Sequence, residues 1–433
     1  YENVLVSYGE LWQRIESKAN KLNEAVYSPN GLVIVKGRDD VENIVNILSV
    51  WRTGRGHIAV DSDIASWDLF AVYQNSEVVG CIGERGALGK LAGSYDRNSS
   101  DSNERYQDSN HELAYAVLSS GTTGKPKLIG ISQKNVQAHL DARSSRYRSS
   151  DKILLSYPLV FDGSITVLIS ALQAGSAIVL PSRKNIGNSK RILDLDGILP
   201  LIFTYQITAL NIVPSLFKSL ISNGESQNIQ SVRHIVLAAE SITAQDWALF
   251  DQILDENVEV WNEYGPSETT VCATEFQLQR KRSIDYTLIP IGKAINGAEI
   301  RILDEQGAIC KDNEEGEIVV LGPIVGVGYL GDAEKTRSAF ISYSSEGISK
   351  SAYKTGDLGF VNNDGDLVWT GRKDNQLKIN GIRVNSLEIE SYLRHIRGAV
   401  EVSTIISGRD RQMPTIISLS LIHISEPTRQ AEI

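Results

Sequence analysis

The feature that most constrains the fold is a repeated alternation of short apolar strands with amphipathic helices. In residues 8–26, Leu11, Ile15, Ala19 and Leu22 recur three and four positions apart, which predicts a helix with one apolar face. Similar patterns predict helices at 41–51, 164–173 and 198–204 and buried strands at 31–35, 78–82, 153–157 and 177–180. Such alternation indicates an α/β fold in which parallel sheets carry helices on their faces.

Two regions depart from this alternation. Residues 94–110 are rich in Ser, Asn and Asp and predict a solvated surface loop. Beyond residue 289, shorter strands at 299–303, 317–321 and 366–369 are separated by Gly and Asp turns. The second half of the chain is therefore expected to contain a more β-rich subdomain.

Composition argues against several classes of protein. Acidic side chains number 53 against 43 basic ones, a formal charge of −10, so no basic face is expected for nucleic acid or an anionic membrane. The 3 cysteines include no Cys-x-x-Cys pair, which argues against a zinc cluster or disulfide framework and favours a reduced, cytoplasmic setting. No apolar run approaches the roughly 18 residues that span a bilayer.

The two ends of the chain suggest a fragment of a longer reading frame. The first residue is Tyr1, and the only methionine is Met413. The final stretch, residues 421–433, reads LIHISEPTRQAEI and resembles a translated sequencing adapter. We expect that stretch to be non-native.

The strongest local motif follows the predicted strand 113–118. Glycines let a backbone turn tightly and approach a ligand, while hydroxyls, amides and lysines can surround phosphate oxygens. Two residues separate the glycines and a proline follows the first lysine, so this is not a Walker A loop. The alternative is a polar surface turn. The motif consists of Ser119, Ser120, Gly121, Thr122, Thr123, Gly124, Lys125, Pro126 and Lys127.

A second motif lies just past the predicted strand 258–261, where α/β sheets place ligands. It comprises Asn262, Glu263, Tyr264, Gly265, Pro266, Ser267, Glu268, Thr269 and Thr270. Tyr264 could stack on a base, and Glu268 could hold a magnesium ion that bridges phosphates. The alternative is a turn into a helix capped by Ser267.

Two weaker motifs lie further along the chain. Asp357, in the segment 353–357, could accept hydrogen bonds from the vicinal hydroxyls of a ribose, or could belong to an ordinary Thr-Gly-Asp turn. The basic segment 378–383 contains Lys378 and Arg383, and its plain alternative is a solvated hairpin.

Taken in order, these motifs resemble the adenylate-forming superfamily, and most closely the amino-acid adenylation domains of nonribosomal peptide synthetases. The resemblance runs from residues 7–11 to residues 388–390 and includes the segments 161–164, 316–318 and 328–330. It implies a large N-terminal region, residues 1–373, with two sheet-and-helix lobes and a β-barrel-like lobe. A small mobile α+β domain would begin at a hinge at Asp374 and is represented by residues 374–433.

The resemblance also implies a reaction in two halves. A substrate carboxylate attacks the α-phosphate of ATP and pyrophosphate leaves; a phosphopantetheine thiol on a peptidyl carrier domain then takes the acyl group. Catalytic roles would fall to Thr123, Lys125, Glu268, Lys378 and Arg383, with Glu268 holding Mg²⁺. ATP or AMP would contact the phosphate loop, namely Ser119, Ser120, Gly121, Thr122, Thr123, Gly124 and Lys127, and also Asn262, Glu263, Tyr264, Gly265, Ser267, Asp357 and Arg372.

The substrate class rests on Asp162, which in this family pairs with the α-ammonium of an amino acid. The plain alternative is an N-cap of the predicted helix 164–173. Small Gly163 and Ala238 would leave room for a bulky side chain, and Glu263 could accept a hydrogen bond at its far end. The set resembles pockets for tyrosine or another aromatic amino acid. By resemblance the pocket consists of Asp162, Gly163, Thr166, Asn211, Val236, Ala238, Glu263, Val271 and Cys272.

The sequence also departs from the family pattern. Gln133 stands where a histidine is common, and His57 where an aromatic is common. The family's catalytic lysine late in the small domain has no counterpart, so we expect the chain as given to adenylate poorly. Two other functions remain open: a free-standing acyl- or aryl-CoA ligase, which would need no partner for an ammonium at Asp162, and a nucleotide-binding remnant without turnover.

Overall fold

The computed structural model describes residues 5–26, 28, 30–62, 78–83, 88–89, 112–119, 127–186, 190–222, 229–280, 288–345, 348–373, 376–379, 382–385, 399–407 and 415–422. The surface loop expected at 94–110, the hinge expected at Asp374 and residues 120–126 of the phosphate-loop motif lie outside these residues. So does most of the stretch expected to be non-native, although its first two residues end a strand. The domain boundary at 373/374 stays a prediction.

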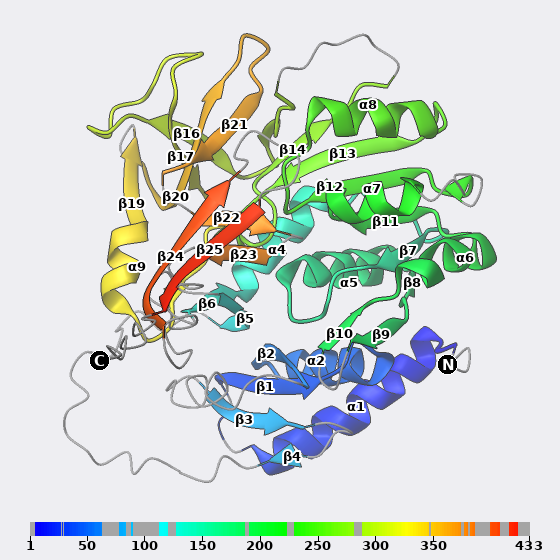
Figure 1. Ribbon diagram of the computed structural model, residues 1–433. Helices are drawn as coiled ribbons and strands as arrows, with labels where there is room; N and C mark the ends of the chain where they lie inside the picture. The colour runs from blue at the N-terminus through cyan, green and yellow to red at the C-terminus, as the bar shows by residue number, and fades with distance from the viewer. Residues whose placement is uncertain are drawn as a thin grey trace, which may run out of the picture.

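The first lobe is a seven-stranded sheet in the order β18-β6-β5-β2-β1-β3-β4. Its middle strands β5, β2, β1 and β3 run parallel, as the sequence predicted, and β6, β18 and β4 are antiparallel to their neighbours. Helices α1 (Tyr8–Ala25) and α2 (Val41–Arg52) pack together beside it (Figure 1). The strands are β1 (Leu32–Gly37), β2 (Gly56–Asp61), β3 (Val78–Ile82), β4 (Leu88–Gly89), β5 (Leu113–Ser119), β6 (Lys127–Ser132) and β18 (Gly328–Tyr329).

The second lobe is another seven-stranded sheet, in the order β15-β14-β13-β12-β11-β7-β8. Strands β13, β12, β11, β7 and β8 are parallel, so their carboxyl ends share one edge. The strands are β7 (Lys152–Leu155), β8 (Ala177–Val179), β11 (Ala209–Ile212), β12 (His234–Ala238), β13 (Glu259–Tyr264), β14 (Thr274–Gln277) and β15 (Lys293–Ala294). A separate two-stranded sheet pairs β9 (Arg183–Ile186) with β10 (Lys190–Leu193).

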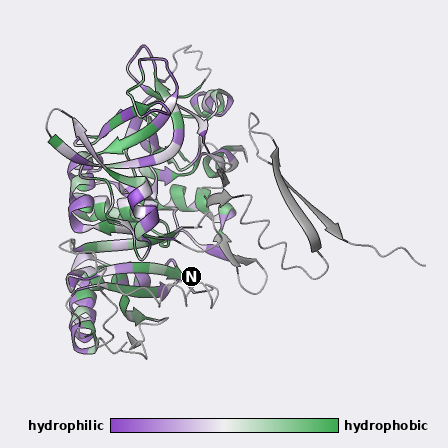
Figure 2. Ribbon diagram, turned by 90° about the vertical axis from the view of Figure 1, so that its left-hand side faces the viewer, coloured by the Kyte–Doolittle hydropathy of each residue, from purple (hydrophilic) through white to green (hydrophobic). Residues whose placement is uncertain are grey.

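Helices cover both faces of this second sheet. On one face α6 (Leu195–Tyr205), α7 (Pro214–Ser222) and α8 (Ala244–Ile253) bury a core around Phe217 and Phe250. On the other, α4 (Gln133–Arg143) and α5 (Asp162–Ala174) lie between the two sheets, because Ile165 packs against β5 and β6 while Val167 packs with β1 and β7. Figure 2 shows hydrophobic residues concentrated in the stacked strands, whereas the helices carry both hydrophobic and hydrophilic residues.

The third lobe is the β-rich subdomain expected after residue 289. Its five-stranded antiparallel sheet follows the order β16-β17-β20-β19 with β21 beside β20. The described strands form an open sheet rather than a closed barrel. They are β16 (Glu299–Leu303), β17 (Gly316–Leu321), β19 (Phe340–Ser345), β20 (Ile348–Val361) and β21 (Leu367–Arg372), with α9 (Ala333–Ala339) alongside. Two hairpins follow, β22 (Gln376–Ile379) with β23 (Ile382–Asn385) and β24 (Ala399–Ser407) with β25 (Thr415–Ile422).

Candidate active site

Strand β13, which belongs to the second sheet, contributes side chains to both sides of the candidate site. Successive side chains of a strand point to opposite faces. Glu263 accordingly forms an ion pair with Arg143 on one side, whereas Tyr264 donates a hydrogen bond to Asp357 on the other. Before them, Asn262 Nδ2 is held by the carbonyl of Pro290 at 2.8 Å. The end of one strand therefore divides the candidate amino-acid side from the candidate nucleotide side.

On the nucleotide side, Asp357 is the centre of a hydrogen-bond cluster. Tyr264 Oη lies 2.6 Å from Asp357 Oδ2, while Arg372 Nη1 and Trp369 Nε1 lie 2.8 and 3.3 Å from Asp357 Oδ1. Burial, and next the adjacent Asp357 charge, raise the pKa of Tyr264 well above its ordinary value, so its hydroxyl stays a donor. Tyr264 and Arg372, which the sequence analysis assigned to the same nucleotide site as Asp357, thus both contact Asp357. Their contact with a nucleotide stays a prediction.

Asp357 lies within strand β20, so its placement in an ordinary Thr-Gly-Asp turn is wrong. Val319 pairs with Lys354 and Glu317 with Leu358, so β17 advances two residues while β20 advances four. The extra residues form a bulge, in which Gly356 has φ +70°, a conformation that favours glycine. Bulges re-aim side chains, and this one presents the Asp357 carboxylate to Tyr264.

A second cluster joins three motifs that lie far apart in the sequence. Glu268 is 2% exposed in the short 3₁₀ helix η3 (Ser267–Thr269), and its Oε1 accepts a 2.9 Å hydrogen bond from Tyr329 Oη. Lys127 Nζ lies 4.8 Å from the centre of the Tyr329 ring. The end of the phosphate-loop motif and the proposed magnesium ligand are thus neighbours. Of the phosphate loop itself, only Ser119 and Lys127 are described, and they pair across β5 and β6.

On the other side of β13, the predicted pocket residues gather at the carboxyl ends of three parallel strands. Asn211 pairs in register with Val236 on β12, and Ala238 pairs with Glu263 on β13. Thr166, on α5, contacts His139 of α4. The Nε2 of His139 lies 2.9 Å from the Thr166 hydroxyl. Asn211 is held by Tyr147, with its Nδ2 2.7 Å from the phenol oxygen.

The loop that follows β13 brings the last two pocket residues to the same place. A Cβ at Gly265 would lie 2.5 Å from the Val271 carbonyl oxygen and 2.7 Å from Cys272 Cα, so only glycine allows this approach. Thr270 and Val271 have φ of 56° and 73°, which are strained values for β-branched residues. Strained backbone of this kind is often found at functional sites. The N-cap of η3 is Pro266, so the expected cap by Ser267 is wrong.

Asp162 is the first residue of α5, and the N-cap is Phe161. Its interpretation as an N-cap is therefore wrong, although a carboxylate in the first turn still suits the N-terminal end of the helix. Neighbouring Gly163 does not simply leave space, because a Cβ there would lie 3.2 Å from Cδ2 of the Tyr157 ring. Tyr157 occupies part of the room that the sequence assigned to a bulky substrate.

A family model described as "AMP-binding enzyme" matches residues 1–330. The chain belongs to this family. Gramicidin S synthase 2 of Brevibacillus brevis is 27% identical over 94% of the chain but only 9% of its own length. The D-alanine–D-alanyl carrier protein ligase of Bacillus velezensis is 28% identical over 92% of the chain and 80% of its own.

A solved structure shares the fold of this AMP-binding enzyme. The nonribosomal peptide synthetase protein PA1221, which contains adenylation and PCP domains, aligns with a TM-score of 0.78 and 24% identity, covering 93% of this chain and 69% of its own. Nonribosomal peptide synthetases are thus among both the homologues and the structural neighbours. Within the described residues, no helix is long and apolar enough to cross a membrane.

The donor set near Glu268 fits magnesium bound together with ATP. In the part of the chain that is described, no group of three or more His, Cys, Asp or Glu side chains could hold a metal alone. A single buried carboxylate suits Mg²⁺, which usually takes its other ligands from phosphates and water. Lys378 and Arg383 pair in register across β22 and β23, so the two strands pair as in the hairpin that the sequence analysis gave as the alternative. Their roles in catalysis stay predictions.

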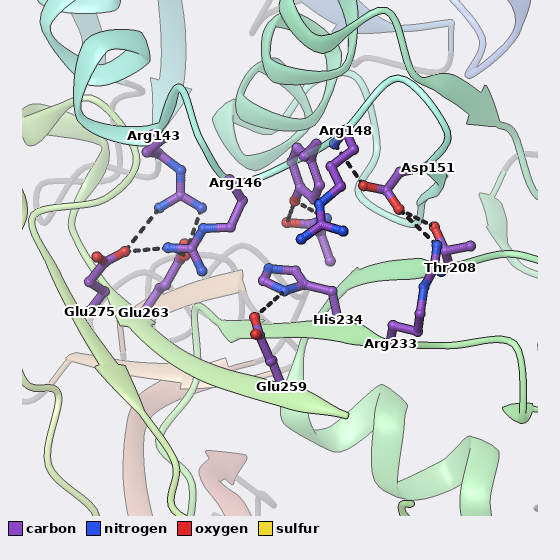
Figure 3. Close-up of polar contacts among 12 residues, drawn as sticks. Arg143, Arg146, Arg148, Asp151, Thr208, Arg233, His234, Glu259, Glu263 and Glu275 are labelled. Atoms are coloured by element: carbon purple, nitrogen blue, oxygen red, sulfur yellow. Dashed lines mark hydrogen bonds and ion pairs between the residues drawn. The ribbon is translucent and has the colours of Figure 1, made fainter. Parts of the chain in front are cut away.

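The sequence analysis missed four residues that border the candidate amino-acid side of this AMP-binding enzyme. His139 and Arg143 come from α4, and Arg146 and Tyr147 follow it. Arg143 Nη2 lies 2.6 Å from Glu263 Oε1, and Arg146 Nη2 lies 3.3 Å from the same atom and also pairs with Glu275 (Figure 3). Arg143 and His139 fall on one face of α4 four residues apart, the one signal that could have suggested them.

Proposed function

We propose that the chain activates an amino acid as an aminoacyl-adenylate and then transfers the acyl group to the phosphopantetheine thiol of a carrier domain. The observation that carries this proposal is the division at β13. Glu263 belongs to the predicted amino-acid pocket, and the next residue, Tyr264, joins the Asp357 cluster predicted for the ribose. A carboxylate from one side could therefore meet a phosphate from the other.

In the first half-reaction, a substrate carboxylate oxygen forms a bond to the α-phosphorus, and the bond to the β-phosphate oxygen breaks to release pyrophosphate. Both reactants are anions, so positive charge must be held beside them. Lys127, together with Lys125 outside the described residues, would supply it. Mg²⁺ held by Glu268 would neutralise further phosphate charge when bound. Asp162 would hold the substrate ammonium, and Asp357 the ribose hydroxyls.

In the second half-reaction, the pantetheine sulfur attacks the acyl carbon, and AMP leaves with the bonding electrons of the mixed anhydride. The relatives that act with carrier proteins, including the D-alanine–D-alanyl carrier protein ligase, support this step. We further propose tyrosine or another aromatic amino acid as substrate, nonribosomal peptide synthesis as the setting and the cytoplasm as the location.

The direct test is ATP–pyrophosphate exchange over the proteinogenic amino acids, using the protein at its natural length. Exchange that depends on one amino acid supports the proposal. Exchange that needs an acid without an α-amino group points to the acyl-CoA ligase alternative. ATP binding without exchange for any acid indicates a nucleotide-binding remnant.

A further inference from the structure

The amino-acid side of the site contains a buried ion-pair cluster that the pocket positions alone do not reveal. The side chains of Arg143, Glu263 and Arg146 are 0%, 5% and 8% exposed, and that of Glu275 is 29% exposed. Figure 3 shows both guanidinium groups pointing toward the two carboxylates. Burial raises the pKa of Glu263, but the two arginines outweigh it and lower that pKa below its ordinary value.

The cluster is balanced in charge. Two guanidinium groups face two carboxylates, and the nearby His139 is neutral because burial lowers its pKa to about 3. A substrate side chain with a charge of its own would unbalance the cluster in a place from which water is largely excluded. A cationic side chain would also face Arg143 and Arg146, and an anionic one would face Glu263.

The cluster nevertheless contains arginine N–H groups that have no hydrogen-bond acceptor within the described residues. Nε and Nη1 of Arg143 and Nη1 of Arg146 are buried and have no hydrogen-bond partner within the described residues. Arg143 Nη1 lies 4.0 Å from Glu275 Oε2, which is too far for a hydrogen bond. Glu263, in contrast, already accepts from Arg143. Buried donors normally have partners, so the unused hydrogens point to an acceptor that arrives with a ligand.

Arg143 is tied to the predicted pocket from several directions. Its partner Glu263 is a pocket position, and the charge of Arg143 acts on the Cys272 thiol, another pocket position. One turn earlier on α4, His139 contacts Thr166, a third pocket position. The unused donors therefore lie beside residues that are predicted to line one end of the pocket.

We propose that the amino acid has an uncharged side chain ending in a hydrogen-bond-accepting oxygen, and that Arg143 donates to that oxygen. Phenol and carboxamide side chains share this chemistry. The inference rests on the proposed activation of an amino acid, and it replaces the requirement for an aromatic side chain with a requirement for an acceptor oxygen. It also reverses the expected role of Glu263, which positions Arg143 instead of accepting a bond from the substrate.

The test uses equilibrium binding, which does not depend on turnover. Hydrolysis-resistant aminoacyl-sulfamoyl adenosines of Tyr, Phe, Gln, Leu, Glu and Lys are titrated into the full chain by calorimetry. We expect Tyr to exceed Phe, or Gln to exceed Leu, by about 10²-fold or more, because a site built to donate rejects the analogue that lacks the acceptor. Tighter binding of the Tyr analogue identifies the acceptor as a phenol, and tighter binding of the Gln analogue identifies it as a carboxamide.

Variants assign the preference to Arg143. Arg143→Met alone would leave Glu263 buried without its main partner, so the decisive variant is Arg143→Met with Glu263→Gln, which removes both charges. In this double variant the preference within the pair should fall below about tenfold, while the phenylalanine or leucine analogue still binds. Arg233→Gln, at an exposed arginine that pairs with Asp151, is the matched control and should retain the preference.

The outcomes separate the two proposals. Tightest binding of the Leu, Phe, Glu or Lys analogue, or a preference that survives in the double variant, would overturn this inference and leave amino-acid activation standing. Failure of all six analogues, with AMP still bound, would count against the proposed function itself.

Discussion

The hydroxyl of Tyr264 lies 2.6 Å from Oδ2 of Asp357 and joins the end of β13 to the bulge of β20. The second and third lobes are thereby held together at the point where the nucleotide is expected. The same carboxylate also accepts from Arg372, so its position does not depend on one donor.

Tyr264→Phe is therefore expected to weaken ATP binding without unfolding the protein. The lost bond lies within the protein and is worth about 1.5–3 kcal/mol of stability, so roughly 10- to 100-fold is the upper limit of the loss in ATP affinity. The KM for ATP in pyrophosphate exchange should rise, while the KM for the amino acid stays near its original value. Equal changes in both constants would contradict the assignment of Asp357 to the nucleotide side.

Glu268→Gln tests the predicted magnesium ligand. Glutamine keeps an acceptor for Tyr329 Oη, so the fold should persist, but the charge that would hold the cation is lost. Exchange should fall by about 10²-fold or more, and higher Mg²⁺ concentrations should restore part of it. Tyr329→Phe, which removes the hydrogen bond and keeps the carboxylate, serves as the control. An unchanged Mg²⁺ dependence in Glu268→Gln would refute the assignment.

Asp162→Ala tests the substrate class. If Asp162 holds the α-ammonium, its removal should weaken amino-acid binding by about 10²-fold or more and leave ATP binding intact. The matched control is Asp196→Ala, because Asp196 also lies in the first turn of a helix but is 82% exposed. Activation that survives in Asp162→Ala would favour the acyl-CoA ligase alternative.

Two buried histidines predict how stability changes with pH. Burial lowers the pKa values of His57 and His139 from 6.5 to about 3. Between these values the unfolded chain binds protons that the folded chain does not, so stability falls as the pH drops below about 6.5. Each histidine contributes a slope of about 1.4 kcal/mol per pH unit across this window.

His57→Phe should remove one of these slopes. The His57 ring lies against Trp51 and Tyr115, with centroids at 5.4 and 6.0 Å, so an aromatic substitute can occupy its place. Urea unfolding measured at pH 5, 6 and 7 should show a shallower pH dependence for the variant. Equal pH dependence in both proteins would mean that the pKa of His57 is the same in the folded and the unfolded chain.

Much of the fold could be predicted because the decisive signals are local. The helix at 8–26 and the strand at 78–82 follow from the spacing of apolar residues, and the structure places α1 at Tyr8–Ala25 and β3 at Val78–Ile82. The grouping of Tyr264, Asp357 and Arg372 was predicted from family resemblance, since nothing local links residues so far apart.

The remainder of the site could not be predicted because it depends on contacts between distant elements. Arg143 looks in sequence like any polar residue at a helix end, and only tertiary structure buries it against Glu263. The bulge at Asp357 depends on the register between β17 and β20, and Tyr157 fills space beside Gly163 from another loop. Each case requires knowledge of which strands and loops become neighbours.

The alternation at the end of β13 limits how this protein can diversify. Glu263 and Tyr264 face opposite directions, and the backbone of the next residue, Gly265, packs closely against Val271 and Cys272. A single inserted or deleted residue in β13 would exchange the two faces and ruin both at once. New substrates are therefore accessible by point substitution around Arg143, whereas length changes in this strand should be absent from any functional descendant.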